Sequence, residues 1–264
     1  MNSPPPIRVM SFNLRNSRAQ DGENAWPYRR DLVIETIRAA NIDLLGVQEA
    51  LSDQVDFLRE RLPDYEQIAV GRDDGACRGE ACALIIKREQ FETIESGTFW
   101  LSEQPQVIAS RGWDAQLPRI CTWSRLRLRD SKIEIVFAST HFDHKGAIAR
   151  VESAKQIVRW ISDAHPSAPA ILAGDFNATD QTPEYAALTT QLRDAWRAIH
   201  RPATKEGGTY HAFTGTRTRE RIDWILCTSD FEVTDCRIDY TNRAGQWPSD
   251  HFPLIATLRL PPSL

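Results

Sequence analysis

Residues 171–180, with the sequence ILAGDFNATD, change character in the middle. A run of apolar and small residues, suited to a buried strand, leads directly into Gly174-Asp175-Phe176-Asn177. Because side chains alternate between the two faces of a strand, Asp175 and Asn177 are expected to point the same way. A core strand that ends in a carboxylate and a carboxamide on one face predicts a functional site at that end.

Two earlier stretches have a similar form. Residues 7–15 alternate apolar and polar side chains and predict a strand that ends near Asn13. Residues 42–50 predict a short apolar strand that ends at Glu49. The chain therefore places polar side chains at the ends of at least three predicted core strands.

Helical spacing of apolar residues separates these strands. Amphipathic helices are expected over 26–40, over 52–62 with Ser52 as the N-cap, and over 147–164. Strands that alternate with helices in this way indicate an α/β fold.

The middle and the C-terminal part are richer in strands. Four middle segments have the β-branched, alternating pattern of neighbouring antiparallel strands, with a hairpin turn between the third and the fourth. These four segments are 81–87, 91–99, 120–128 and 132–141, and further strands are expected over 168–176, 221–227, 231–240 and 253–260.

The length and charge of the chain limit its organisation and its partners. Its 264 residues contain no linker-like stretch and no internal repeat, so a single domain is expected over 1–264. The formal net charge is −4 at pH 7, and nothing in the balance indicates the basic face of a protein that holds many phosphates. Nucleic acid is therefore a possible but not a favoured partner.

The ends and the cysteines bear on the compartment. The first residues, MNSPPP, lack the apolar segment of a signal peptide, and no run approaches the length of a membrane span. The five cysteines are odd in number and mostly scattered through apolar segments, which favours reduced thiols. We expect a cytoplasmic protein without membrane insertion, and no feature indicates an obligate protein partner.

The polar residues at the predicted strand ends form a set with a definite chemistry. Carboxylates, carboxamides and histidines without a thiolate cluster are ligands suited to Mg²⁺ or Mn²⁺. The chain has no G-x-S-x-G elbow, P-loop or G-x-G-x-x-G motif, so serine hydrolases, P-loop NTPases and dinucleotide enzymes lack their signatures. The set comprises Asn13, Glu49, His141, Asp175, Asn177, Asp223, Asp250 and His251.

Six ordered motifs carry a resemblance to a known family. SFNLR, LLGVQEA, STHFDH, GDFNA, RIDWIL and SDHFP resemble the motif series of the endonuclease/exonuclease/phosphatase superfamily, the metal-dependent phosphoesterases related to abasic-site endonucleases, sphingomyelinases, inositol polyphosphate 5-phosphatases and deadenylases. The match runs from Asn13 to His251. The resemblance implies a four-layer α/β sandwich, in which two mainly antiparallel sheets face each other and helices cover the outside.

The resemblance also implies a role for each member of the set. Glu49 would be the principal Mg²⁺ or Mn²⁺ ligand, with Asn13 beside it and Asp250 completing the site. Asp175 would orient and deprotonate the attacking water, and Asn177 would hold that water or a phosphate oxygen.

The remaining members of the set would act on the phosphate. His251 and His141 would contact the non-bridging oxygens, where negative charge is held in the transition state. Asp223 would accept a hydrogen bond from His251 and favour its protonated form, because an adjacent carboxylate stabilises imidazolium.

The sequence also departs from one branch of the family. Abasic-site endonucleases carry an acid two residues after the motif asparagine, where this chain has Arg15, and their catalytic tyrosine has no clear counterpart here. Arg119 and Lys145 are candidates for phosphate binding, with an ordinary surface cation as the alternative for each. Large aromatic residues could stack on a base or sugar or simply pack in the core, and these are Trp100, Trp113 and Trp247.

These observations predict an Mg²⁺- or Mn²⁺-dependent phosphoesterase. It is expected to hydrolyse phosphate esters, with phosphodiester bonds preferred, by direct in-line attack of an activated water. The alternative is a nuclease or deadenylase-like enzyme that acts on DNA or RNA. A catalytically silent binding module would lack acid or base positions, yet Glu49, Asp175, Asp250 and His251 are all present.

Overall fold

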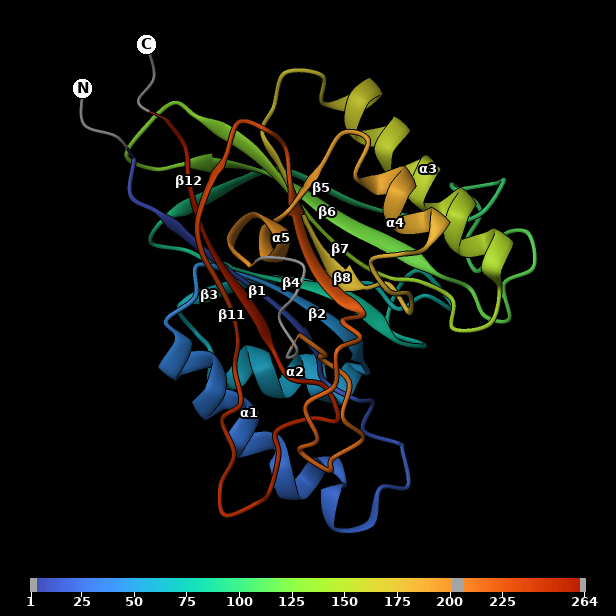
Figure 1. The fold of residues 1–264 in the computed structure, drawn as a ribbon, viewed down its shortest axis with the longest axis vertical. Coiled ribbons are helices and arrows are strands. Elements are labelled where there is room, and N and C mark those ends of the chain that lie inside the picture. Colours follow the sequence, from blue (N-terminus) through green and yellow to red (C-terminus); the bar gives the residue numbers. More distant parts are fainter. Residues whose placement is uncertain (1–3, 201–206, 262–264) are drawn as a thin grey trace.

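Two β-sheets of six strands each form the centre of the computed structural model, which describes residues 4–200 and 207–261 (Figure 1). The first sheet has the order β11 (Glu232–Ile238), β12 (Leu254–Arg259), β1 (Ile7–Asn13), β2 (Leu44–Ala50), β4 (Ala81–Lys87) and β3 (Tyr65–Ile68). The second sheet has the order β5 (Phe91–Trp100), β6 (Ile120–Leu128), β7 (Glu134–His141), β8 (Ala170–Asp175), β10 (Asp223–Cys227) and β9 (Arg193–Asp194).

Each sheet contains one parallel pair at its centre, and its other pairs are antiparallel. The parallel pairs are β1–β2 and β7–β8, and a helix connects the two strands of each pair. This agrees with the need of parallel neighbours for a long crossover connection. The expectation that residues 81–87 neighbour residues 91–99 is wrong, because β4 pairs with β2 and β3 whereas β5 pairs with β6 in the other sheet.

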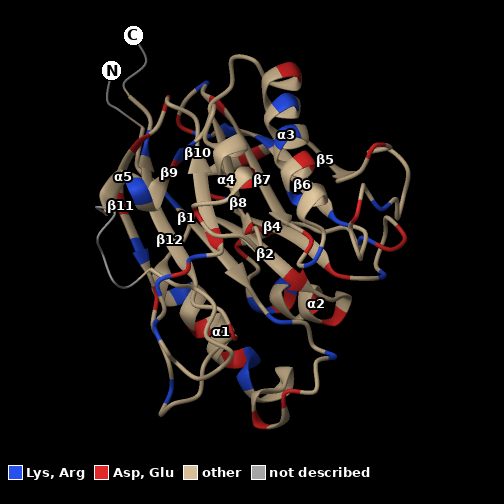
Figure 2. Cartoon of the chain, turned by 45° about the vertical axis from the view of Figure 1, so that its right-hand side comes forward, with Lys and Arg blue, Asp and Glu red and all other residues tan. Residues whose placement is uncertain are grey.

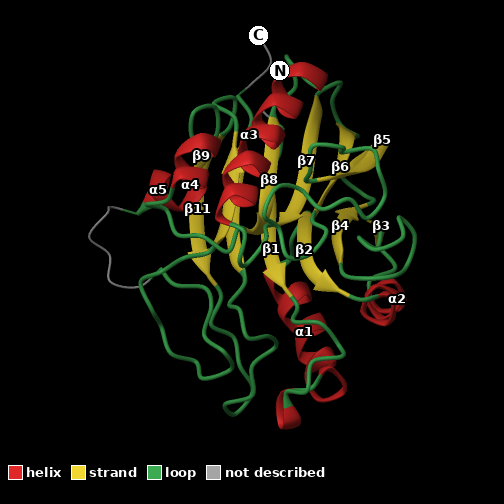
Figure 3. Cartoon of the chain, turned by 90° about the vertical axis from the view of Figure 1, so that its right-hand side faces the viewer, coloured by secondary structure: helices red, strands yellow, loops and turns green. Residues whose placement is uncertain are grey.

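Helices cover the outer faces of both sheets, so the molecule has four layers, as the resemblance implied (Figure 3). Apolar side chains of α1 (Trp26–Ala40) and α2 (Ser52–Arg61) pack on the first sheet. Those of α3 (Ala147–Ala164) and α4 (Pro183–Leu188) pack on the second. Two short elements complete the chain, the 3₁₀ turn η1 (Gly22–Asn24) and α5 (Ala195–Ile199).

The start of α2 differs from the sequence expectation. Ser52 is the first helical residue, and the N-cap is Leu51. The Leu51 N–H donates to Gln54 Oε1 at 3.1 Å, so the side chain of Gln54 satisfies a backbone donor that precedes the helix. A serine before a polar run is therefore not sufficient to locate a helix start.

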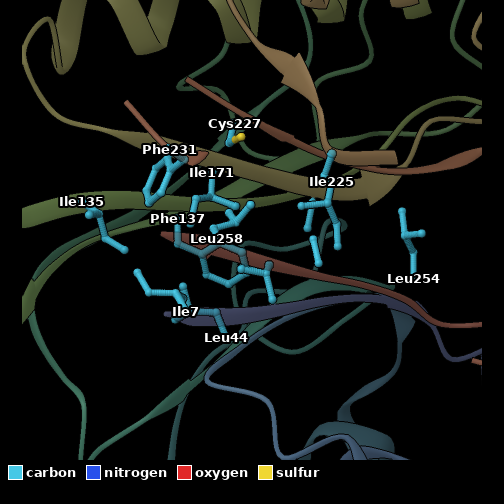
Figure 4. Packing of buried hydrophobic residues seen from close by; sticks show 14 of the residues in the cluster. Ile7, Leu44, Ile135, Phe137, Ile171, Ile225, Cys227, Phe231, Leu254 and Leu258 are labelled. Atoms are coloured by element: carbon cyan, nitrogen blue, oxygen red, sulfur yellow. The ribbon is translucent and has the colours of Figure 1, made fainter. Parts of the chain in front are cut away.

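The main core lies between the two sheets and follows strand alternation. Ile7 and Leu44 of the first sheet face Phe137, Ile171 and Ile225 of the second (Figure 4). The intervening residues point outward and pack beneath the helices. The period-two pattern of each strand thus builds an inner and an outer apolar layer.

The residues between the two sheets change from apolar to polar towards the ends of β1, β2, β7 and β8. The sheets approach closely there, because a Cβ on Gly46 would lie 3.0 Å from both Ala173 Cβ and Ser139 Oγ. Gln48 Nε2 donates to Ser139 Oγ at 3.1 Å and so bridges the sheets inside the core. Beyond this constriction the next inward-facing residues are polar, which places a polar site at one end of the sandwich.

The surface and the helices carry both signs of charge. Both basic and acidic residues lie along α1 and α3 in Figure 2. Within the described residues, no helix combines the length and the apolar character needed to cross a membrane. All five cysteines are free thiols, and Cys77 is the exposed member of the set.

Candidate active site

A cavity of about 400 Å³ opens at the polar end of the sandwich, between the ends of the two sheets. Seven of the residues predicted from the sequence line it, namely Glu49, Arg119, His141, Asp175, Asn177, Asp250 and His251. Asn13 and Asp223 lie directly behind the lining and contact it by hydrogen bonds. Lys145 is exposed and does not belong to the lining.

Glu49 reaches the cavity through an irregularity in β2. The register of β2 against β4 shifts between Val47 and Ala50, and Glu49 has a left-handed backbone with φ of 61°. Such a conformation is uncommon for a residue other than glycine and is typical of functional positions. Gln48 already lies on the inner face, where it donates to Ser139, so strand alternation alone would direct Glu49 outward, and the bulge turns it towards the cavity.

The carboxylate of Glu49 is held by amide donors. Asn13 Nδ2 donates to Glu49 Oε1 at 3.0 Å, and the Asn16 N–H donates to Oε2 at 3.1 Å. Burial alone would raise the pKa of Glu49. The hydrogen bond from Asn13 and the positive charge of His251 outweigh burial, so the pKa is lowered and the carboxylate is ionised.

Asn13 connects the two sheets at the site. Its Nδ2 also donates to Asp175 Oδ2 at 2.9 Å, so one carboxamide bridges Glu49 of the first sheet and Asp175 of the second. Its Oδ1 accepts the Arg15 N–H at 2.9 Å. Asn13 therefore directs a nitrogen towards the carboxylates and uses its oxygen to hold the following turn.

Asp175 and Asn177 both line the cavity, but strand alternation does not explain the position of Asn177. β8 ends at Asp175, and Asn177 has a left-handed backbone with φ of 48°. Its N–H donates to Asp175 Oδ1 at 2.9 Å, and its Nδ2 lies 3.0 Å from His141 Nε2. A turn that the Asp175 side chain caps thus brings the two groups together.

Asp175 has an unusual proton affinity. It is almost completely buried, and burial together with the negative charge of Asp223 raises its pKa to about 7. The positive charge of His251 acts in the opposite direction, with Nε2 at 3.8 Å from Asp175 Oδ2. The carboxyl therefore exchanges its proton near neutral pH.

His251 and Asp223 form a buried pair. His251 Nδ1 lies 2.9 Å from Asp223 Oδ2, the contact that the sequence predicted across 28 positions. Burial lowers the pKa of His251, but the charge and the hydrogen bond of Asp223 raise it more, so the net pKa is well above 6.5. The imidazole is accordingly protonated at neutral pH.

His141 has the opposite character. Burial lowers its pKa well below 6.5, and the nearby guanidinium groups of Arg119 and Arg72 lower it further. Its Nδ1 is buried without a hydrogen-bond partner among the described residues. His251 is thus cationic and His141 neutral, a division that lets neighbouring groups take different roles.

Arg119 lies buried in the cavity wall, with 3% of its surface exposed. Its Nε is 3.4 Å from Asp143 Oδ2 and its Nη2 is 3.1 Å from His144 Nδ1. Nη1 is buried without a partner among the described residues. A buried guanidinium donor left unpaired in a cavity wall is suited to an anionic ligand.

The predicted tryptophans do not line the cavity, as far as the described residues show. Trp100 is buried and donates from Nε1 to the Arg72 carbonyl at 2.8 Å. Trp247 packs edge-on against His211 and Phe252. For Trp100 and Trp247, packing is the observed role.

Sequence reasoning missed several lining residues. Arg15, which the sequence analysis treated only as a departure from the family pattern, lines the cavity together with Asn16, Glu80, His144 and Tyr210. Glu80 immediately precedes a strand that runs antiparallel to β2, with Ala81 opposite Ala50, a pairing that the sequence alone did not indicate. The start of such a strand lies beside the end of its neighbour. The ring of Tyr210 packs edge-on against His251, with centroids 5.1 Å apart.

A buried arginine supports the loops around the site. Arg29 is fully buried on α1, and its guanidinium donates to the carbonyls of Leu14, Arg15 and Asn24. It also donates to the Pro248 carbonyl at 2.8 Å. Arg29 therefore joins the loop after β1 to the loop that precedes β12.

The donor atoms fit a small divalent cation. One ligand atom from each of Glu49, His141 and Asp175 lies within 4.8 Å of the others, and Asp175, Asp223 and His251 form a second such group. Asp250 belongs to neither group and lies 3.8 Å from Arg15 Nε. Glu49, Asp175 and Asp250 line the same cavity, and a divalent ion would offset the negative charge that these carboxylates bring together.

Comparisons with known proteins agree with the motifs and the fold. A model of the Endonuclease/Exonuclease/phosphatase family matches residues 10–251. Nocturnin of Drosophila melanogaster is 25% identical over 313 residues, covering 97% of this chain and 47% of that protein. The chain spans about half the length of the curated relatives it matches.

Two solved structures from Bacteroides thetaiotaomicron are similar throughout. An endonuclease/exonuclease/phosphatase family protein is 35% identical with a TM-score of 0.92, covering 98% of this chain and 100% of that chain. A mannosyl-6-phosphatase is 35% identical with a TM-score of 0.89, covering 96% of this chain and 99% of that chain. The family match, the four-layer fold and the polar cavity are consistent with one another. The chain belongs to the endonuclease/exonuclease/phosphatase family, whose members are hydrolases of phosphate esters.

Proposed function

We propose that this protein is a divalent-metal-dependent phosphoesterase that hydrolyses a small phosphate ester by in-line attack of water. The observation that carries this proposal is the grouping of Asp175, with a pKa near 7, between a cationic His251 and a neutral His141 in one cavity. Asp175, which accepts the proton of the water, thus lies beside His251, whose positive charge offsets the negative charge of the phosphate.

Glu49 is the principal metal ligand in this proposal, with Asp175 and His141 in reach of the same ion. A bound Mg²⁺ or Mn²⁺ would polarise the phosphoryl group and offset its negative charge. Asn13 orients the two carboxylates through its Nδ2, so we assign it a positioning role beside the ion. Asp250 adds a further carboxylate to the cavity lining, beside Arg15.

Asp175 accepts the proton of the attacking water. Its two oxygens are oriented by Asn13 and by the Asn177 N–H, which fixes the direction of the carboxylate. Asn177 also holds His141 through its Nδ2 and faces the position of the water or of a phosphate oxygen. A base whose pKa is close to the working pH transfers protons efficiently.

The charge of the phosphate is held on the other side of the cavity. Protonated His251 and the unpaired Nη1 of Arg119 donate hydrogen bonds to the non-bridging oxygens. Charge-assisted hydrogen bonds of this kind are stronger than neutral ones. Lys145 lies outside the lining, so its proposed contact with phosphate requires a substrate that extends beyond the cavity.

The relatives bear on the bond that is cleaved. A relative named mannosyl-6-phosphatase, 35% identical over almost the whole chain, supports a phosphate monoester over the diester expected from the sequence. The net charge of −4 supports a small substrate over a nucleic acid. Hydrolysis of single-stranded DNA or RNA in preference to small esters would establish the nuclease alternative.

A substrate screen tests the proposal. Purified protein with Mg²⁺ or Mn²⁺ should hydrolyse at least one small phosphate ester, and Glu49→Gln should lose most of this activity while it keeps the fold by circular dichroism. Glu60→Gln, on the exposed face of α2, is the matched control. Undiminished activity after exhaustive dialysis against EDTA, or in Glu49→Gln, would contradict the assignment.

A further inference from the structure

Glu80 is a partly buried carboxylate that the catalytic scheme above does not use. It lies at the start of β4 and lines the cavity with 18% of its side chain exposed. Its Oε2 accepts from Arg72 Nη1 at 2.6 Å and lies 4.0 Å from His141 Nδ1. Burial is expensive for a carboxylate, and Arg72 offsets only part of this cost.

A braced loop holds Glu80 in place. Arg72 N–H donates to the Glu80 carbonyl, and Asp73 N–H donates to the Arg78 carbonyl, so residues 71–80 form a compact hairpin-like turn. Trp100 Nε1 fixes the backbone of Arg72 from the second sheet. A carboxylate on such a rigid support has a defined direction, as a recognition group requires.

The position of Glu80 separates it from the reaction centre. His141 stands between the two carboxylates, because its Nε2 is 3.6 Å from Asp175 Oδ2 and its Nδ1 faces Glu80. Glu80 therefore adjoins the phosphate position without reaching the water that Asp175 activates. In in-line attack the alcohol leaves on the side opposite the water, so a group on the far side of His141 from Asp175 would meet the alcohol part of the ester.

The cavity favours one class of alcohol. Leu117, Ile222 and the ring of Tyr210 are the apolar contributions to its lining, and the rest is polar or charged. Bases are usually held by stacking on aromatic platforms, and lipids need a broad apolar surface. A carboxylate beside guanidinium groups instead suits hydroxyl groups, which donate to the one and accept from the other.

We infer that Glu80, held by Arg72, accepts hydrogen bonds from hydroxyl groups of the substrate, so that the preferred substrate is a phosphate ester of a polyhydroxylated, sugar-like alcohol. The inference rests on the proposed function and names the alcohol that the same site selects. Glu80 is thereby a specificity residue, and its removal affects hydroxylated substrates more than others. A site built to bind a hydroxyl group discriminates strongly against analogues that lack it.

The test compares two substrates in three proteins. In Glu80→Gln, the ratio of kcat/KM for a hexose 6-phosphate to kcat/KM for phenyl phosphate should fall at least about 10-fold relative to wild type, the scale of one charged hydrogen bond. Glu89→Gln, at the opposite end of β4 and exposed, is the matched control and should leave the ratio within about twofold. Thermal unfolding of all three proteins checks the fold.

Substrate variation tests the inference without relying on one variant. Among monodeoxy hexose 6-phosphates, at least one should lose about 10-fold in kcat/KM with wild type and show no additional loss with Glu80→Gln, because the same hydrogen bond is already absent. An unchanged substrate ratio in Glu80→Gln would overturn the inference, as would a wild-type preference for adenosine 5′-monophosphate over the hexose phosphates. If wild type hydrolyses no phosphate ester, the proposed function itself fails.

Discussion

The residue that most clearly reflects two conflicting demands is Asp175. It is buried between the two sheets, yet the proposed mechanism requires it to ionise and accept a proton. Burial and Asp223 raise its pKa to about 7, while hydrogen bonds from Asn13 and the Asn177 N–H stabilise the charged form. The protein thereby keeps a carboxyl group that is useful near neutral pH at a cost in stability.

Replacing this carboxyl should separate activity from stability. Asp175→Asn should lower kcat by roughly 10²–10⁴, the contribution of a positioned general base. In EDTA it should also raise Tm, because the folded state holds a proton up to about pH 7 whereas the unfolded carboxyl loses its proton near pH 4. The contribution of Asp175 to the stability of wild type thus falls as pH rises through this window.

The corresponding measurement is a pair of Tm profiles in EDTA. The difference in Tm between Asp175→Asn and wild type should grow from about pH 4 to pH 7 and then level off. Asp163→Asn, exposed on α3, serves as the control and should show no such trend. A variant that retained more than half of the wild-type kcat would remove Asp175 from the role of base.

The pair of Asp223 and His251 has its own pH signature. Asp223 raises the pKa of His251, so Asp223→Asn should lower that pKa and make the imidazole lose its proton at lower pH. The alkaline limit of kcat/KM should move to lower pH accordingly, and titration of the His251 ring by NMR would measure the same shift. A double variant that combines Asp223→Asn with His251→Ala should lose far less activity than the product of the two single losses. Multiplicative losses would contradict the pairing.

At the level of elements, irregular backbone positions decide which side chains reach the site. Strand periodicity was sufficient to predict most strands and the convergence of their polar ends. It could not predict that Glu49 turns inward on a bulge or that Asn177 follows a left-handed turn, because both depend on long-range pairing. Glu80 escaped notice for the same reason, since its importance depends on β4 pairing with β2.

Short elements were also beyond sequence reasoning. β3, β9, α4 and α5 have between two and six residues, too few for a period to be recognisable. The placement of β4 beside β5 failed because periodicity identifies a strand but does not identify its partner. Ordered motifs, in contrast, predicted residues from across the chain that the structure brings together at one cavity.

Arg29 connects the loop after β1 to the loop before β12, and its contribution to stability can be measured. Arg29→Met removes the donor shared by four backbone carbonyls and should lower the free energy of unfolding by roughly 3 kcal/mol or more, since each buried unsatisfied group is costly. Arg30→Met, next in the chain and exposed over Phe57, should cost less than about 1 kcal/mol. Equal costs in urea denaturation would show that Arg29 does not hold the loops together.

At the level of the whole molecule, the site exists only where both sheets meet. Glu49 belongs to the first sheet and Asp175 to the second, and Asn13 bridges them. A divalent ion bound between them would act as a further cross-link and would stabilise the folded state by mass action. Metal binding should therefore be visible in global unfolding as well as in catalysis.

A bound divalent ion should raise the Tm of the protein. At about 100 times its Kd, an ion that binds only the folded state contributes about 2.7 kcal/mol, which corresponds to a Tm rise of roughly 5–10 °C for a chain of this size. Mn²⁺ or Mg²⁺ should produce this rise in wild type and a much smaller one in Glu49→Gln. The same rise in both proteins would place the ion elsewhere.

The position of β12 between β1 and β11 has a consequence for synthesis on the ribosome. Ile7 pairs with Leu258, and Asp250 and His251 immediately precede this last strand. An emerging chain can form the β1–α1–β2 unit early, but the first sheet keeps an open edge until residues through β12 have left the exit tunnel. The residues of the proposed site therefore come together only when β12 pairs with β1, and a chain that stops before β12 exposes an unpaired strand edge.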